Sequence, residues 1–150
     1  MAKGKLLDNR GWDKLFKEIR KSDGLGLNVG IVDSEVATYA EANEFGTRTI
    51  PSRPFMRSTF DENKEKYNKT FSRFLRSGKT IRGAFGLLGL IVVSDIRKKI
   101  KSRMTPANAQ STAEAKGEDN TLVNTGTMRR SVTYEIVTIG EGITKIGGEE

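Results

Sequence analysis

The segment Ser77-Gly78-Lys79-Thr80 has the residue types that end a nucleotide-binding phosphate loop. In such a loop, backbone N–H groups and the lysine surround the phosphates, and the hydroxyl reaches the magnesium ion. The full motif also needs a glycine five positions before its second glycine, where this chain has Arg73. It needs a preceding strand as well, whereas the residues before Ser77 have helical periodicity. The sequence therefore argues against a nucleotide site.

Carboxylates are the other groups that could do chemistry, and they occur in two small sets. The set within residues 61–65 falls in the first turns of an expected helix, where acidic side chains complement the helix dipole. The set within residues 114–119 lacks the spacing of a calcium loop. The chain has no histidine and no cysteine, which removes the usual general base, disulfides and the common zinc sites. We therefore predict no enzyme activity, no catalytic residue, no metal site and no cofactor.

Positive charge is concentrated in the middle of the chain, whose net charge is +7. Residues 61–103 carry 12 basic and 4 acidic side chains, whereas residues 104–150 carry 4 basic and 7 acidic ones. Tyr67, Phe71 and Phe74 lie among the cations, an arrangement that can stack nucleic-acid bases. Their helical spacing instead favours an apolar core face beside a solvated charged face. Non-specific proximity to DNA and contact with an acidic protein both stay open.

Periodicity predicts the elements of the first half of the chain. Residues 9–21 should form an amphipathic helix, and residues 25–32 alternate as a strand does. After a turn at Asp33-Ser34, a short helix is expected around residues 39–44. The arm Ile50–Pro54 should be extended, because each proline restricts the residue before it. Ser52 is expected to cap the next helix, with Pro54 in its first turn.

Two long helices should follow, one from Pro54 to about Arg76 and one over about residues 79–103. Three glycines recur every third residue of the second helix, at 83, 86 and 89. Since each weakens a helix by about 1 kcal/mol relative to alanine, we expect another element to approach closely there. Residues 104–123 are polar and aperiodic, which predicts a long flexible loop. Residues 131–139 should be a strand, followed by a short partner strand at 143–146.

These elements predict the α+β class: a small antiparallel β-sheet packed against two long α-helices, with a long flexible loop, in a single domain spanning 1–150. The apolar fraction of 35% is low, which suggests a fold completed by neighbouring subunits. The longest apolar stretch, Ala84–Val93, is shorter than the roughly 20 residues that cross a bilayer, so we expect no membrane association.

Two stretches carry a more specific signal. The first is Tyr39-Ala40-Glu41-Ala42-Asn43-Glu44-Phe45-Gly46-Thr47, followed by Ile50-Pro51-Ser52-Arg53-Pro54-Phe55. The second is Lys116-Gly117, then Leu122-Val123-Asn124-Thr125-Gly126, Met128 and Ser131-Val132-Thr133-Tyr134. Their order and spacing along residues 36–137 resemble the virion-morphogenesis and tail-completion family of long-tailed bacteriophages, which includes minor tail proteins.

The resemblance implies an α+β subunit that assembles into a homo-oligomeric ring, taken as sixfold, at the head-proximal end or neck of the tail. The expected location is the virion, after assembly in the host cytoplasm, and no reaction is implied. The expected partners are further copies of the chain, the tail terminator or tail tube protein, and head–tail connector proteins. The residues expected at these interfaces are Tyr39, Glu44, Phe45, Gly46, Ile50, Pro51, Arg53, Pro54, Phe55, Lys116, Leu122, Thr125, Gly126 and Met128.

Alternatives stay open at two levels. The chain could be another neck component, an adaptor or a stopper, or it could be a basic DNA-binding protein, a reading supported only by the charge of residues 61–103. The motif residues themselves could either turn the chain within one domain or contact neighbouring subunits.

Overall fold

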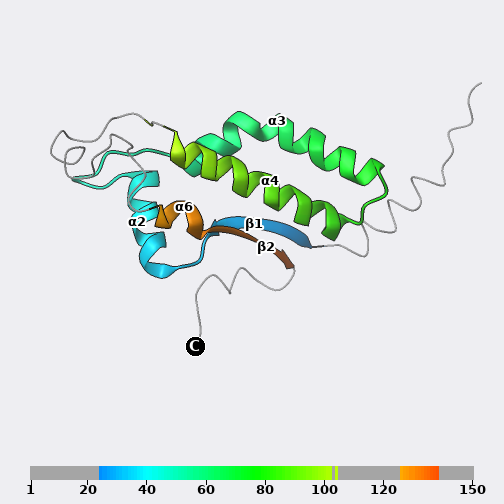
Figure 1. Cartoon of the computed structure of the whole chain (residues 1–150), viewed down its shortest axis with the longest axis horizontal. Coiled ribbons are helices and arrows are strands. Elements are labelled where there is room, and N and C mark those ends of the chain that lie inside the picture. Colours follow the sequence, from blue (N-terminus) through cyan, green and yellow to red (C-terminus); the bar gives the residue numbers. More distant parts are fainter. Residues whose placement is uncertain (1–23, 103, 105–125, 139–150) are drawn as a thin grey trace, which may run out of the picture.

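The computed structural model describes residues 24–102, 104 and 126–138, and within them the fold is α+β, as predicted (Figure 1). The elements are β1 (Leu25–Ile31), α2 (Ser34–Phe45), α3 (Phe55–Arg76), α4 (Ile81–Lys101), α6 (Thr127–Ser131) and β2 (Val132–Thr138). The predicted helix at 9–21, nearly all of the predicted loop at 104–123 and the predicted strand at 143–146 lie outside the described residues.

The helix α2 is longer than the sequence suggested. A helix was expected only around residues 39–44, with a turn at Asp33-Ser34, but α2 begins at Ser34. The Asp33 carboxylate accepts a hydrogen bond from the backbone N–H of Val36 at 3.0 Å. Asp33 is therefore the N-cap of the helix, and a side-chain cap of this kind typically contributes about 1 kcal/mol.

The strands β1 and β2 pair antiparallel, with Leu25 opposite Thr138 and Ile31 opposite Val132. The apolar side chains of both strands, Val137 excepted, share one face of this sheet, because alternate residues point the same way. On the other face the Asn28 amide donates to the Glu135 carboxylate at 3.4 Å. The alternation predicted for both strands therefore gives the sheet one apolar face and one largely polar face.

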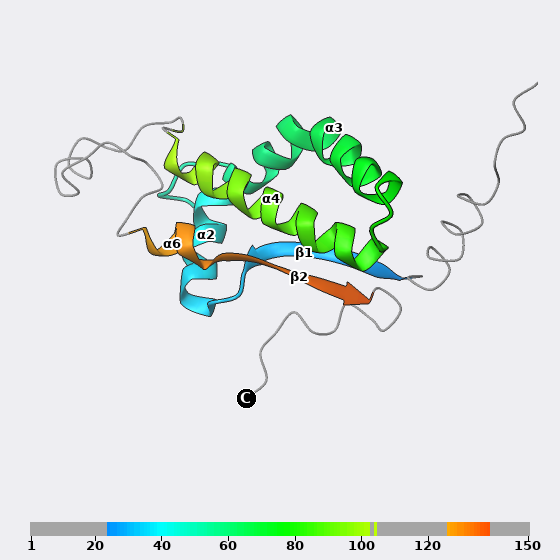
Figure 2. The same ribbon diagram turned by 45° about the vertical axis from the view of Figure 1, so that its right-hand side comes forward.

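The helix α4 is the central layer of the fold. It packs on the apolar face of the sheet, and α3 packs on α4 (Figure 2). The sequence did not predict this layer order. The core lies at these contacts, and its fully buried side chains include Phe55, Val92, Ile96, Ile100 and Val132. Burying each such side chain contributes about 1.5–3 kcal/mol.

Polar contacts fix α3 against α4. The Asp95 carboxylate of α4 accepts hydrogen bonds from the Lys66 ammonium at 2.5 Å and from the Tyr67 hydroxyl at 3.1 Å. Burial raises the pKa of the Tyr67 hydroxyl well above its ordinary value, and the nearby Asp95 charge adds to that rise. Tyr67 therefore stays protonated and keeps donating. Lys99 and Glu62 form a further ion pair at 2.6 Å.

The close approach predicted beside the α4 glycines is confirmed at Gly89. A Cβ atom built there would overlap the Tyr134 ring of β2, lying 2.6 Å from its Cγ atom. At Gly86 the nearest such atom is the Tyr134 hydroxyl oxygen at 4.0 Å, an ordinary contact. At Gly83 the nearest atom is the hydroxyl of Thr80, so no second element approaches that position closely. The gap left by Gly89 lets the sheet pack against the helix.

We expect Gly86→Ala and Gly89→Ala to have opposite effects on the free energy of unfolding. Both changes improve helix propensity by about 1 kcal/mol. Only Gly89→Ala overpacks the contact with Tyr134, which typically costs about 1–3 kcal/mol. Urea unfolding should show Gly86→Ala to be more stable than the natural protein and Gly89→Ala to be less stable by about 1 kcal/mol. A stabilised Gly89→Ala variant would contradict the packing described here.

Candidate interaction surface

The junction between α2 and α3 is built around the buried carboxylate of Glu44. Its Oε2 atom accepts from the backbone N–H of Met56 and its Oε1 atom accepts from that of Arg57, both at 2.9 Å. Glu44 therefore caps the start of α3 from the end of α2. A carboxylate at this position satisfies two N–H groups that have no partner within the helix and also complements the helix dipole.

The expectation that Ser52 caps α3 is wrong. The N-cap position of α3 is occupied by Pro54, and the Ser52 hydroxyl donates instead to the Glu44 carbonyl at 2.9 Å. The reason is positional: an N-cap side chain reaches the N–H groups two or three residues ahead, and Ser52 stands two residues before the cap. Ser52 thus satisfies a carbonyl at the end of α2.

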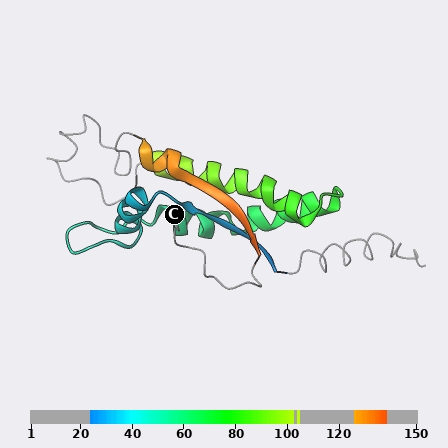
Figure 3. The same ribbon diagram turned by 90° about the horizontal axis from the view of Figure 1, so that it is seen from below.

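The residues between α2 and α3, numbers 46–54, form an arm that extends beyond α2, away from the rest of the fold (Figure 3). Its tip is closed by a hydrogen bond from the Thr47 N–H to the Ile50 carbonyl at 2.7 Å. Its return is fixed by a bond from the Arg53 N–H to the Asn43 carbonyl at 2.6 Å. Backbone hydrogen bonds thus close the arm near its tip and at its base, where its two prolines predict a restricted backbone.

Gly46 sets the path by which the chain enters this arm. Its backbone has φ 78° and ψ 164°, a combination that residues with a side chain rarely adopt. A Cβ atom there would lie 2.9 Å from the Ser52 nitrogen and 3.2 Å from the Ile50 oxygen. The chain segments that enter and leave the arm are therefore in direct contact at this glycine.

The structure places the residues expected at interfaces in different environments. Four are buried inside the subunit: Glu44, Arg53, Phe55 and Met128. Two are glycines with a positive φ, Gly46 and Gly126. The remaining described ones are at least partly exposed: Tyr39, Phe45, Ile50, Pro51 and Pro54. Lys116, Leu122 and Thr125 lie outside the described residues. Within the described set, the buried residues shape the surface, and the exposed ones are available to a partner.

Two exposed aromatic side chains lie on α2, Phe45 at its end beside the arm and Tyr39 six residues earlier. The Phe45 side chain is 65% exposed and that of Tyr39 is 38% exposed. The Arg57 guanidinium lies over the Phe45 ring, 5.8 Å from its centroid. We call Tyr39, Phe45 and the exposed arm residues 47–49, 51 and 52 the arm surface. It combines apolar rings with polar backbone and one cation, Arg48, a composition typical of protein–protein contacts.

The segment Ser77–Thr80 is a connection between two helices. The N–H of Gly78 donates to the Leu75 carbonyl at 3.0 Å and that of Lys79 to the Phe74 carbonyl at 3.2 Å, which closes the end of α3. The Thr80 hydroxyl accepts from the Gly83 N–H at 3.1 Å and caps α4. The Gly78 and Lys79 N–H groups and the Thr80 hydroxyl therefore take part in the ends of α3 and α4.

A second surface, which the sequence did not predict, is a groove of about 600 Å³ between α4 and α6. The described residues that line it are Leu90, Val93, Ser94, Arg97, Lys98, Lys101, Arg129 and Arg130. The Arg97 guanidinium donates to the Val132 carbonyl at 2.9 Å, which holds α4 beside the α6–β2 segment. The sequence indicated only the positive charge of residues 61–103, which include Arg97, Lys98 and Lys101, and gave no sign that the α6 cations lie beside them. We call this surface the basic groove.

Among residues 24–102, 104 and 126–138, no three acidic side chains gather closely enough to hold a metal ion. No helix in this part of the chain is both long and apolar enough to cross a membrane. Comparison with protein-family models, with curated proteins and with solved structures gives no match.

Proposed function

We propose that the chain is a structural protein of a bacteriophage virion that completes the head-proximal end of the tail and helps to join it to the head. In this proposal the subunits form a homo-oligomeric ring of six copies. The observation that carries it is the arm surface, because the residues that resemble the tail-completion family are the ones that build it. Glu44, Gly46 and Arg53 fix the arm from inside, and Tyr39 and Phe45 remain outside.

The stiffness of the arm supports a role in assembly. A loop that becomes ordered only on binding loses conformational entropy at that moment, which weakens association. Here the Thr47 and Arg53 N–H groups already donate to backbone carbonyls within the subunit, which limits the conformations open to the arm. The exposed Phe45 ring and the extended Pro51 are then presented to a neighbour with little further ordering.

We expect the purified protein, alone or with tail extracts, to sediment as a species larger than its 16.6-kDa chain, and a sixfold ring would have a mass of about 100 kDa. Phe45→Glu should weaken this association at least about tenfold, because it places a charge where an aromatic ring is expected to be buried. Val32→Glu is the matched control, since Val32 is 79% exposed and lies outside the arm surface. Both variants should remain folded.

Location within the virion tests the tail-completion role itself. Cryo-electron microscopy of particles should place the protein between the head and the tail tube, and the position within the neck decides between tail completion and an adaptor or stopper. A strict monomer under all these conditions that is also absent from virions would refute the proposal.

A further inference from the structure

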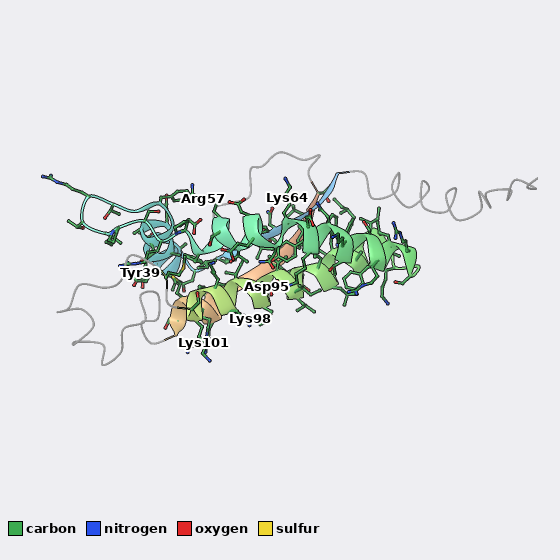
Figure 4. All side chains as sticks on the ribbon, turned by 90° about the horizontal axis from the view of Figure 1, so that it is seen from above. Tyr39, Arg57, Lys64, Asp95, Lys98 and Lys101 are labelled. Carbon is green, nitrogen blue, oxygen red and sulfur yellow. The ribbon has the colours of Figure 1, made fainter. Side chains whose placement is uncertain are left out.

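The basic groove brings together cations that are far apart in the sequence. Arg97, Lys98 and Lys101 come from the last turns of α4, and Arg129 and Arg130 come from α6. Figure 4 shows Lys98 and Lys101 along one side of α4, with Lys64 on the opposite side of the helical pair. The described lining contains no carboxylate. The nearest ion pair of Lys98, with Asp95, is long at 3.9 Å and leaves the lysine side chain 76% exposed.

The groove also has an apolar component. Leu90 is 58% exposed, although its neighbours on α4 are largely buried, and Val93 lies beside it. A nucleic-acid backbone offers phosphates to the cations but no aliphatic groups to contact Leu90 and Val93. The described lining also has no aromatic ring on which a base could stack. A protein segment with carboxylates and aliphatic side chains matches both components.

This chain contains such a segment. Residues 114–123 read Glu-Ala-Lys-Gly-Glu-Asp-Asn-Thr-Leu-Val, with three carboxylates followed by two aliphatic residues. We propose that the basic groove binds residues 114–123 of a second copy of this chain. The carboxylates of Glu118 and Asp119 pair with Arg129 and Arg130, and Leu122 and Val123 cover Leu90.

Binding between the basic groove of one copy and the acidic segment of another fits a ring of identical subunits. Because the ring is part of the proposed function, the inference rests on that function. A cyclic assembly needs two different and complementary patches on each subunit, so that every copy both offers one and receives the other. The basic groove and the acidic segment form such a pair within one chain. Complementary charge also guides the register in which subunits meet.

The test uses charge reversal on the full chain, followed by sedimentation. Arg129→Glu combined with Arg130→Glu should weaken self-association at least about tenfold, and so should Glu118→Lys combined with Asp119→Lys. An equimolar mixture of the two variants should recover association, because the reversed groove of one then faces the reversed segment of the other. Association of the natural protein should fall with added salt. Lys64→Glu with Arg76→Glu, on α3, is the control of equal charge change and should leave association unchanged.

Circular dichroism and urea unfolding establish that each variant is folded. A further double variant, with Arg129→Gln and Arg130→Gln, removes the charge of α6 without reversing it. If Phe45→Glu abolishes association and the groove variants do not alter it, the ring stands and the groove proposal is overturned. If the mixture of the groove and segment variants fails to recover association, the proposal that Glu118 and Asp119 of one copy pair with Arg129 and Arg130 of another is overturned. If the groove variants lose only binding to short duplex DNA, the groove serves nucleic acid instead. A natural protein that never self-associates would overturn the ring as well.

Discussion

Replacing Gly46 with alanine should lower the free energy of unfolding by about 3 kcal/mol. The backbone conformation of this residue alone costs a side-chain-bearing residue about 1–3 kcal/mol. The added Cβ atom would also lie 2.9 Å from the Ser52 nitrogen and 3.2 Å from the Ile50 oxygen. Both atoms belong to the backbone of the arm and cannot rotate away. Urea unfolding measures the loss, and sedimentation should show that association weakens too, because the arm surface is displaced.

Gly78→Ala is the matched control for this prediction. Gly78 also has a positive φ, 86°, but a Cβ atom there would meet nothing within 4 Å. Its replacement should therefore cost only the conformational term, about 1–2 kcal/mol. Equal losses at the two positions would mean that the arm yields to the added methyl group and is not held as described.

Replacing Glu44 with alanine should cost about 3 kcal/mol or more. The change removes both hydrogen bonds from the carboxylate to the Met56 and Arg57 N–H groups, and hydrogen bonds to charged groups contribute about 1.5–3 kcal/mol. Because Glu44 is buried, the change also leaves a cavity at the junction. The midpoint of urea unfolding should shift while its slope stays the same, since the surface exposed on unfolding hardly changes.

Two further variants separate the charge of Glu44 from its position. Glu44→Gln keeps the size and one acceptor oxygen, so its loss should fall between that of alanine and zero. Glu41→Ala removes an exposed carboxylate from the same helix and should change stability by less than about 0.5 kcal/mol. If Glu41→Ala costs as much as Glu44→Ala, the effect belongs to α2 as a whole and not to the cap of α3.

The long helices and the two strands could be predicted because their signals are local. Apolar spacing decides which face of α3 or α4 is buried, and alternation does the same for β1 and β2. The caps were harder to predict. Asp33 was interpreted as part of a turn although it caps α2, and the cap of α3 comes from Glu44, 12 residues before Met56. A cap that arrives from another helix has no fixed spacing in the sequence.

The two candidate surfaces also differ in how far a local sequence signal could predict them. The prolines near residue 50 indicated a stiff arm, because proline restricts the backbone wherever it stands. The basic groove could not be predicted, since Arg97 comes beside α6 and β2 only in the folded chain, where its guanidinium donates to the Arg130 and Val132 carbonyls, 33 and 35 residues away. The motif residues also could not be sorted in advance: only the fold shows that Glu44 and Phe55 are buried while Phe45 is exposed.

The pairing of β1 with β2 sets an order of events during synthesis on the ribosome. Asn28 and its partner Glu135 are 107 residues apart, so β1 is made long before the strand that completes its sheet. At about 5–20 residues per second, this interval lasts about 5–20 s. During that time α3 and α4, whose contacts are closer in sequence, can already form their hairpin. The apolar side of α4 that β2 will cover is then open, and it is shielded once β2 has been made.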